Sequence, residues 1–192
     1  GNARSPAFLL YGGRNDYRKT MGINGNFHVK ANLLKDLIFK SLIGFNLNSL
    51  ASKTFSMVEV ATSERGTYDQ LSQSSSTSYL WNWTNTIEYD KVFGRHNLSV
   101  LLGTEAVASA YNYLGGSRQQ FFSKNPNYMQ LSVGEREITN SGSMSEWSLF
   151  SQFGRLNYNF LNRYFLQATV RRDGSSRFGE ENRWGIFPSF SA

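Results

Sequence analysis

The chain has 192 residues, a formal net charge of +6 at pH 7, 15% aromatic residues and no cysteine. The aromatic content is too high for a disordered chain, and the lack of cysteine excludes disulfide frameworks, cysteine-based zinc sites, iron–sulfur clusters and thiol catalysis. No signal peptide is present, and no apolar run approaches the roughly 18 residues that a transmembrane helix needs. A helical membrane protein is therefore excluded. Because the sequence opens without Met and stops within an alternating segment, we expect an internal fragment of a longer protein.

Hydrophobic and polar residues alternate from Met21 to Leu33. The odd positions carry mostly apolar side chains, whereas Asn24, His28 and Lys30 stand at even ones. A helix would scatter these residues around its circumference, but a strand sends one set to each face. The segment is therefore predicted to be a β-strand with Ile23 on its apolar face and Asn24 on its polar face.

The same alternation recurs in five further predicted strands: Leu37–Leu47, Tyr79–Tyr89, Leu98–Ala108, Tyr164–Val170 and Trp184–Phe190. A seventh, Trp147–Phe160, is less regular, because its apolar residues are odd-numbered up to Phe153 and even-numbered from Leu156. One inserted residue would restore a single apolar face, and glycine favours such a β-bulge. We therefore predict a bulge at Gly154-Arg155.

Short and long connections alternate between these strands. The short ones are Leu34–Asp36, Asp90–His96 and Leu161–Arg163, and the long, polar ones are Leu50–Thr77, Tyr111–Ser145 and Asp173–Asn182. Up-and-down barrels of outer membranes have this asymmetry, with tight periplasmic turns and large outer loops. The sequence therefore predicts an all-β fold of antiparallel up-and-down strands, each about 10 to 14 residues long, with all long connections on the outer side.

Aromatic residues fall near both ends of the predicted strands, as in the girdles of membrane barrels. With the long loops outside, Tyr79, Trp81, Trp83 and Trp147 are predicted at the outer rim, and Tyr89, Tyr158, Phe160 and Tyr164 at the periplasmic rim.

The run from Asn162 to Gly179, which contains Arg-Arg-Asp-Gly-Ser-Ser-Arg-Phe-Gly, and its continuation from Asn182 to Ser189 closely resemble the barrel of the SusC/RagA family of TonB-dependent outer-membrane transporters of Bacteroidetes. Less specific likenesses to this family lie in Phe93–Leu98, Leu101–Glu105, Phe153–Tyr158 and the opening Asn2–Pro6, which looks like the end of an outer loop.

This resemblance implies a transmembrane barrel of about 22 strands, of which residues 1–192 would form about seven, without the plug domain. It also implies an outer-membrane importer, in a Gram-negative bacterium, of large nutrients such as glycans, oligosaccharides or peptides. A SusD-like surface lipoprotein and TonB are the implied partners, and outer-membrane lipid would surround the barrel. The residues alone indicate only the wall of an outer-membrane barrel.

The family motif is the candidate site of this chain. We predict a structural role at an outer hairpin, because Asp-Gly after an alternating strand is hairpin chemistry and glycine supplies the positive φ of a tight turn. Its arginines could alternatively grip a carboxylate or a sugar. Arg171, Asp173 and Arg183 are expected to face the lumen or rim, and Arg172 the outer rim. The motif residues are Arg171, Arg172, Asp173, Gly174, Ser175, Ser176, Arg177 and Phe178.

No other pattern predicts chemistry. His28 and His96 have no second ligand at a metal-binding spacing, so we expect neither a metal site nor another cofactor. Paired carboxylates are expected to be solvated loop charges rather than an acid–base pair, so no enzyme is predicted; these are Glu135, Glu137, Glu180 and Glu181. Lysine and arginine are spread along the whole chain, which argues against nucleic-acid binding.

Two alternatives to the importer remain open from the sequence. A soluble β-rich carbohydrate-binding module would use the same serine, asparagine and aromatic content, but it would bury its apolar face. A passive porin-type barrel would have the same wall without an upstream plug domain. The bound substrate and the residues that contact it are not identified by the sequence.

Overall fold

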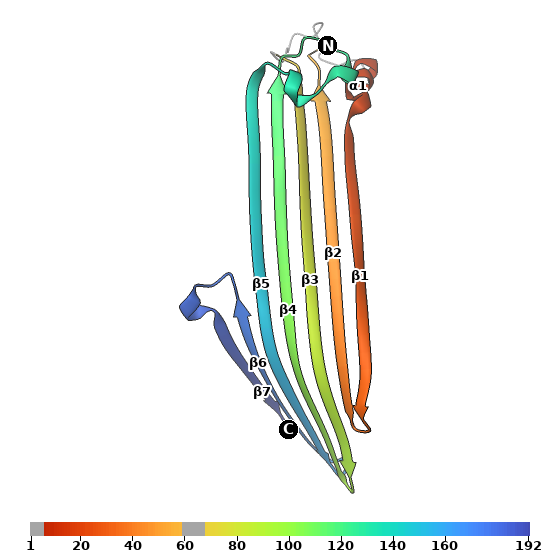
Figure 1. Cartoon of the computed structure of the whole chain (residues 1–192), viewed down its shortest axis with the longest axis vertical. Coiled ribbons are helices and arrows are strands. Elements are labelled where there is room, and N and C mark those ends of the chain that lie inside the picture. Colours follow the sequence, from red (N-terminus) through yellow and green to blue (C-terminus); the bar gives the residue numbers. More distant parts are fainter. Residues whose placement is uncertain (1–5, 59–67) are drawn as a thin grey trace. The chain divides into compact units, whose positions relative to one another are not determined.

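A computed structural model of the chain describes residues 6–58 and 68–192, so Asn2–Ser5 of the predicted outer-loop end lie outside the described residues. The elements follow one another as α1 (Pro6–Gly12), β1 (Tyr17–Leu34), β2 (Leu37–Ser56), β3 (Gln70–Phe93), β4 (His96–Gln119), β5 (Arg136–Phe160), β6 (Tyr164–Ser175) and β7 (Trp184–Ser191) (Figure 1). Short 3-10 helices cover Gly13–Asn15, Pro126–Tyr128, Leu131–Val133 and Glu180–Asn182.

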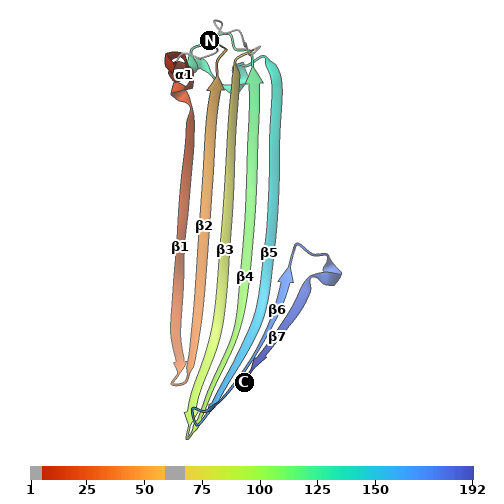
Figure 2. The same cartoon turned by 180° about the vertical axis from the view of Figure 1, so that it is seen from behind.

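The strands of the described residues form a seven-stranded sheet in the order β1-β2-β3-β4-β5-β6-β7, so each strand pairs with its neighbours in sequence. The view from behind shows the same succession of strands (Figure 2). The predicted all-β, antiparallel up-and-down fold is confirmed. No helix among the described residues has the length and apolar character needed to cross a membrane.

Strands β2 to β5 are 20 to 25 residues long, which exceeds the predicted length. Most described residues of the predicted loops 50–77 and 111–145 therefore belong to strands, including the whole serine-rich stretch Ser72–Ser78 in β3. Hydrophobic alternation stops where one face no longer meets an apolar environment, but the backbone hydrogen-bond ladder needs no apolar side chains to continue. The predicted strands end where the hydrophobic alternation ends, whereas the observed strands continue as far as the backbone hydrogen bonds do.

The short connections are tight turns. Gly94 has φ +62° at the first position of the two-residue turn between β3 and β4, as a type II′ hairpin requires. The predicted connection Asp90–His96 is thus too long, because β3 continues to Phe93. Leu161 and Asn162 both have positive φ in the next tight turn, which Arg163 N–H closes by donating to the Phe160 carbonyl at 3.1 Å.

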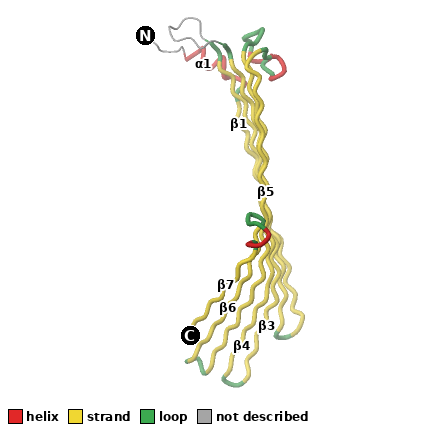
Figure 3. The backbone as a smooth tube through the Cα atoms, turned by 90° about the vertical axis from the view of Figure 1, so that its left-hand side faces the viewer, coloured by secondary structure: helices red, strands yellow, loops and turns green. Residues whose placement is uncertain are grey.

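Longer links join the other ends of the strands, so the predicted alternation of short and long connections is observed. The tube view shows the β4–β5 and β6–β7 links, with their short helices, joining strand ends (Figure 3). The link between β4 and β5 comprises residues 120–135 only.

The prediction of a bulge at Gly154-Arg155 is wrong for the pairing of β5 with β6, which is regular at these residues. Pairing between β5 and β6 runs one-to-one from Leu149 opposite Ser175 to Phe160 opposite Tyr164, without an inserted residue. Phe153 stands opposite Arg171 in this register, and the Arg171 guanidinium lies 5.5 Å from the centre of the Phe153 ring. Phe153 and Leu156 therefore lie on opposite faces of β5, as their odd and even positions in a regular strand require.

Phe153 is accommodated on this second face by a glycine of the neighbouring strand. A Cβ atom at Gly103 of β4 would lie 2.4 Å from the Phe153 ring, so the ring occupies the space that another residue would fill. Strand alternation places Trp147 and Leu149 on the same face as Phe153, not on the face of Leu156 and Phe160.

The chain forms two compact units, one of Gly1–Gly22, Asn48–Ser78 and Tyr111–Ser145 and a second of Ile23–Leu47, Tyr79–Ala110 and Glu146–Ala192. The first unit has a small core of Phe55, Leu71, Phe121 and Met129, with Met57, Leu131 and Val133 packed against it.

The β4–β5 link is fixed to the first unit by this core and by hydrogen bonds. Lys53 Nζ donates to the Met129 carbonyl at 2.7 Å, and Arg14 Nη2 donates to Asn125 Oδ1 at 2.8 Å. Asn125 Oδ1 also accepts from the Asn127 N–H and so caps a 3-10 helix. The link is therefore a folded cap over the face of β2 and β3 that carries Phe55 and Leu71.

Candidate functional site

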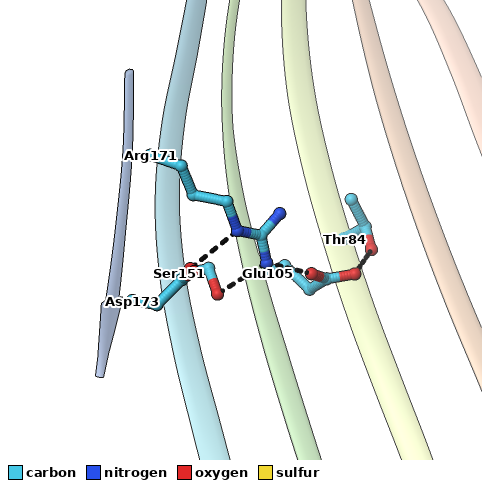
Figure 4. A network of polar contacts seen from close by, with 5 residues as sticks. All are labelled: Thr84, Glu105, Ser151, Arg171 and Asp173. Carbon is cyan, nitrogen blue, oxygen red and sulfur yellow. Dashed lines mark hydrogen bonds and ion pairs between the residues drawn. The ribbon is translucent and has the colours of Figure 1, made fainter. Parts of the chain in front are cut away.

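A network of polar side chains joins four strands of the second unit. Arg171 Nη2 donates to Glu105 Oε2 at 2.9 Å and to Ser151 Oγ at 2.9 Å, while its Nε donates to Asp173 Oδ1 at 2.7 Å (Figure 4). Thr84 Oγ1 donates to the other oxygen of Glu105 at 3.4 Å. The network thus links β3, β4, β5 and β6 on one face of the sheet.

The network is half-exposed and carries one more negative than positive charge. The side chains of Arg171, Glu105 and Asp173 are 40%, 29% and 32% exposed. Solvent screens pairs of this kind, so each ion pair contributes at most about 1 kcal/mol, although a shared arginine fixes the relative positions of several strands. Nothing in this geometry brings a nucleophile next to a base.

The motif residue Arg172 lies on the opposite face of β6. Its guanidinium lies 4.2 Å from the centre of the Trp184 ring. Gly174 supports the same tryptophan, because a Cβ atom at Gly174 would lie 2.8 to 2.9 Å from three carbons of the ring. The motif therefore contributes to both faces, with Arg171 and Asp173 on one and Arg172 and Gly174 on the other.

The prediction that Asp173-Gly174 forms a tight turn is wrong. Both residues belong to β6, where they pair with Gly185 and Trp184 of β7, and Gly174 is not among the described residues with positive φ. Glycine is required here for the close approach of a ring rather than for a turn.

The end of the motif begins the link to β7. Ser176 N–H donates to the Ser148 carbonyl at 2.9 Å, and Ser176 Oγ accepts from the Ser148 N–H at 2.8 Å. Arg177 lies 4.9 Å above the Trp147 ring, while Phe178 is 60% exposed.

The other predicted residues are placed apart from this network. His96 Nδ1 lies 2.6 Å from Tyr158 Oη, and the imidazole stacks on Phe160 and Phe93. His28 lies in β1 and is exposed. No three histidine, aspartate or glutamate side chains converge within residues 6–58 and 68–192. The paired carboxylates are exposed. Glu135 lies directly before β5 and Glu137 in it, while Glu180 and Glu181 belong to a 3-10 helix.

The face that carries Arg172 is otherwise largely apolar and exposed. Leu102, Ile186 and Phe190 are 60%, 66% and 78% exposed. Aromatic residues border this face at two levels. One level has Tyr158, Phe160, Tyr164, Phe93 and His96, and the other has Phe150 and Trp184 in an edge-to-face contact.

The two aromatic levels are a membrane thickness apart. Phe150 and Phe160 are separated by ten residues of the same strand. At about 3.3 Å per residue and a tilt of about 40°, ten residues rise about 25 Å, which equals the height of the apolar band of a membrane barrel. The predicted girdle assignments of Tyr158, Phe160 and Tyr164 agree with this arrangement, but Trp147 lies on the other face.

In the first unit, one face of the sheet is lined by hydroxyl groups. Ser52 and Ser74 share a hydrogen bond of 2.8 Å, and Ser117 and Thr139 one of 2.7 Å. A shallow hollow on this hydroxyl face has no charged residue in its lining; its hydroxyl-bearing members are Ser52, Thr54, Ser72, Ser74, Tyr113, Ser117, Thr139 and Ser141. The β4–β5 link covers the opposite face and leaves the hydroxyl face open.

The fold is similar to part of solved transporter structures. Over 92% of this chain and 20% of the other, it matches a structure of the RagAB peptide transporter with a TM-score of 0.84 and 24% identity. A structure of the RagAB peptide importer in a closed-closed state matches over 90% of this chain and 19% of the other, with a TM-score of 0.83 and 25% identity.

Sequence relatives point the same way. The chain is 28% identical to TonB-dependent receptor P3 of Formosa agariphila over 91% of its own length and 17% of the receptor. It is 36% identical to TonB-dependent receptor SusC of Bacteroides thetaiotaomicron over 60% of its own length and 11% of that protein. The chain therefore spans less than a fifth of these curated relatives. No protein-family model matches the chain.

Proposed function

We propose that this chain, which belongs to the SusC/RagA family of TonB-dependent outer-membrane receptors, is part of the barrel wall of an energy-coupled importer of large nutrients. In this proposal residues 1–192 are a barrel fragment, and the whole protein works with a SusD-like surface lipoprotein and with TonB. The RagAB structures are of a peptide transporter, and that name describes the relative rather than the cargo of this chain.

The observation that carries the proposal is the exposed apolar face between two aromatic levels. A soluble protein rarely exposes to water a contiguous apolar face that extends about 25 Å along its strands, whereas a membrane barrel places such a face against lipid. The opposite face of the same strands carries the Arg171 network and the ion pair of Lys40 with Glu88. One apolar face and one polar face are expected of a wall between lipid and a hydrated lumen.

The hydroxyl face supports a neutral, hydroxylated cargo over a charged peptide. It uses the even-numbered positions of β2 and β3, as Lys40 and Glu88 do, so strand alternation assigns it to the luminal set of residues. Hydroxyl groups can donate and accept with the hydroxyls of a sugar, and Tyr113 offers a ring against which a sugar can lie. A glycan is therefore the cargo that we propose.

The motif then has a structural role. Arg171, Glu105 and Asp173 fix the spacing of neighbouring strands, and Gly174 seats Trp184 at the outer girdle. In this proposal no residue of the chain catalyses a reaction on the cargo, and no cofactor is needed.

Uptake by the full-length transporter tests the proposal. Cells that express the transporter with its lipoprotein should take up labelled oligosaccharide, and dissipating the proton gradient or deleting TonB should abolish that uptake. A porin-type barrel would continue to admit the sugar without TonB, so that result would contradict energy-coupled import.

A substitution on the hydroxyl face tests the contact with the cargo. Tyr113→Ala should lower uptake of oligosaccharide at equal surface expression, whereas Tyr128→Ala, a change of the same size at an exposed position of the link, should not. Peptide uptake that is lost in Tyr113→Ala while oligosaccharide uptake persists would contradict a glycan cargo.

A further inference from the structure

The apolar face of the second unit has a hollow between its two aromatic levels, close to the level of Phe150 and Trp184. Its floor is apolar, because Leu102 and Val170 flank Gly154, which has no side chain to fill the space between them. Leu102 and Val170 are 60% and 49% exposed. The surface around Gly154 is therefore apolar and exposed, as contact with an aliphatic chain requires.

Polar residues also line this hollow, among them Asn85 and Thr104. Gln152 and Arg172 line it and lie opposite each other in the pairing of β5 with β6, and both are exposed. Arg172 stacks on Trp184 but joins none of the ion pairs found among the described residues. An arginine on a lipid-facing surface is costly unless it reaches the headgroups or an anion.

The depth of Arg172 suits a headgroup contact. It lies eight residues after Tyr164 in β6 and therefore about 20 Å from the aromatic level of Tyr164. The level of Phe150 and Trp184 lies two residues further along β6, because both pair with Gly174. The long side chain of Arg172 can extend to the headgroups along the Trp184 ring. Arg183 lines the adjacent hollow together with Trp184, so a second cation is close to the same level.

We propose that this hollow binds a phosphate-bearing lipid of the outer leaflet. An acyl chain would lie over Leu102, Gly154 and Val170, and the phosphate would accept hydrogen bonds from Arg172, with Arg183 adding positive charge. The planar guanidinium suits a phosphate because two N–H groups can donate to it side by side. This inference uses only the barrel-wall part of the proposed function and assigns a ligand to its outside.

Native mass spectrometry of the full-length transporter with added lipid A tests the site. The double variant R172Q/R183Q should bind lipid A about tenfold more weakly than the wild type, since it removes the charge-assisted hydrogen bonds. Dephosphorylated lipid A should bind the wild type as weakly as lipid A binds the variant. R172K, which keeps the charge but loses the paired N–H geometry, should fall between the two proteins.

The matched control is R155Q, which removes an arginine from the opposite face of β5 and should leave lipid A binding unchanged. Equal binding by wild type and R172Q/R183Q, or an equal loss in R155Q, would overturn the inference. So would a dimer that dissociates in R172Q/R183Q without any loss of lipid, because the hollow would then hold a second copy. Heat-modifiable migration of every variant confirms an inserted barrel, so failure of the lipid site is distinguishable from failure of the barrel assignment.

Discussion

Gly174→Ala tests the assignment of the motif as a support for the outer girdle. The added methyl group would meet three carbons of the Trp184 ring at 2.8 to 2.9 Å, well inside van der Waals contact. The ring cannot move freely, because Arg172 lies over it and Phe150 meets it edge to face.

The expected cost follows from two opposing effects. Overpacking at a constrained site costs about 1 to 3 kcal/mol. Replacing glycine in a strand gains about 0.5 to 1 kcal/mol, because the unfolded chain loses freedom. The net destabilisation of the barrel should therefore be about 0 to 2.5 kcal/mol, roughly 1 kcal/mol at the midpoints of the two ranges, with a shift of Trp184 fluorescence as the ring is displaced.

Urea titration of the full-length barrel in lipid vesicles measures this cost. Gly179→Ala is the control, because a Cβ atom there meets nothing within 4 Å and the φ of −58° suits alanine. Gly179→Ala should be neutral or slightly stabilising. Equal stability of the two variants would show that the contact between Gly174 and Trp184 does not constrain the girdle.

Three further predictions use the same titration. Val100→Arg, on the apolar face, should cost about 2 to 4 kcal/mol, whereas Ser99→Arg on the polar face should cost less than 1 kcal/mol; equal costs would refute the face assignment. Leu161→Asn should stabilise the barrel by up to about 1 kcal/mol, because asparagine tolerates the positive φ of that turn better than leucine does, and an unchanged midpoint would contradict this. A double-mutant cycle of Arg171→Met with Glu105→Gln should give a coupling of about 0.5 to 1 kcal/mol, and zero coupling would remove the network as a source of strand spacing.

The apolar halves of the strands could be predicted from the sequence because each strand repeats its signal every second residue. The strand extensions could not be predicted in this way. Ser72–Ser78 has no apolar alternation, yet it continues β3 because the neighbouring strands supply hydrogen-bond partners for its backbone. Such pairing depends on residues far away in the sequence.

The side of the sheet on which Phe153 lies could not be predicted from the sequence of its own strand either. From β5 alone, a bulge and a change of face explain the parity equally well. The choice depends on Gly103 of β4, which leaves room for the ring, and on Arg171 of β6, which lies over it. Likewise, Asp173-Gly174 has the composition of a turn, but the glycine is explained by Trp184 of β7.

In a barrel wall, one face of these strands meets lipid and the other meets water. A nitroxide scan along β6, Tyr164–Ser175, in the full-length transporter in bilayers distinguishes the two faces. Labels at Leu166 and Val170 should collide with dissolved oxygen, which concentrates in lipid, and labels at Gln167 and Thr169 should collide instead with a water-soluble nickel complex. Accessibility to the two reagents should alternate with a period of two residues and opposite phase. Uniform access of the nickel complex to all four positions would contradict a membrane wall.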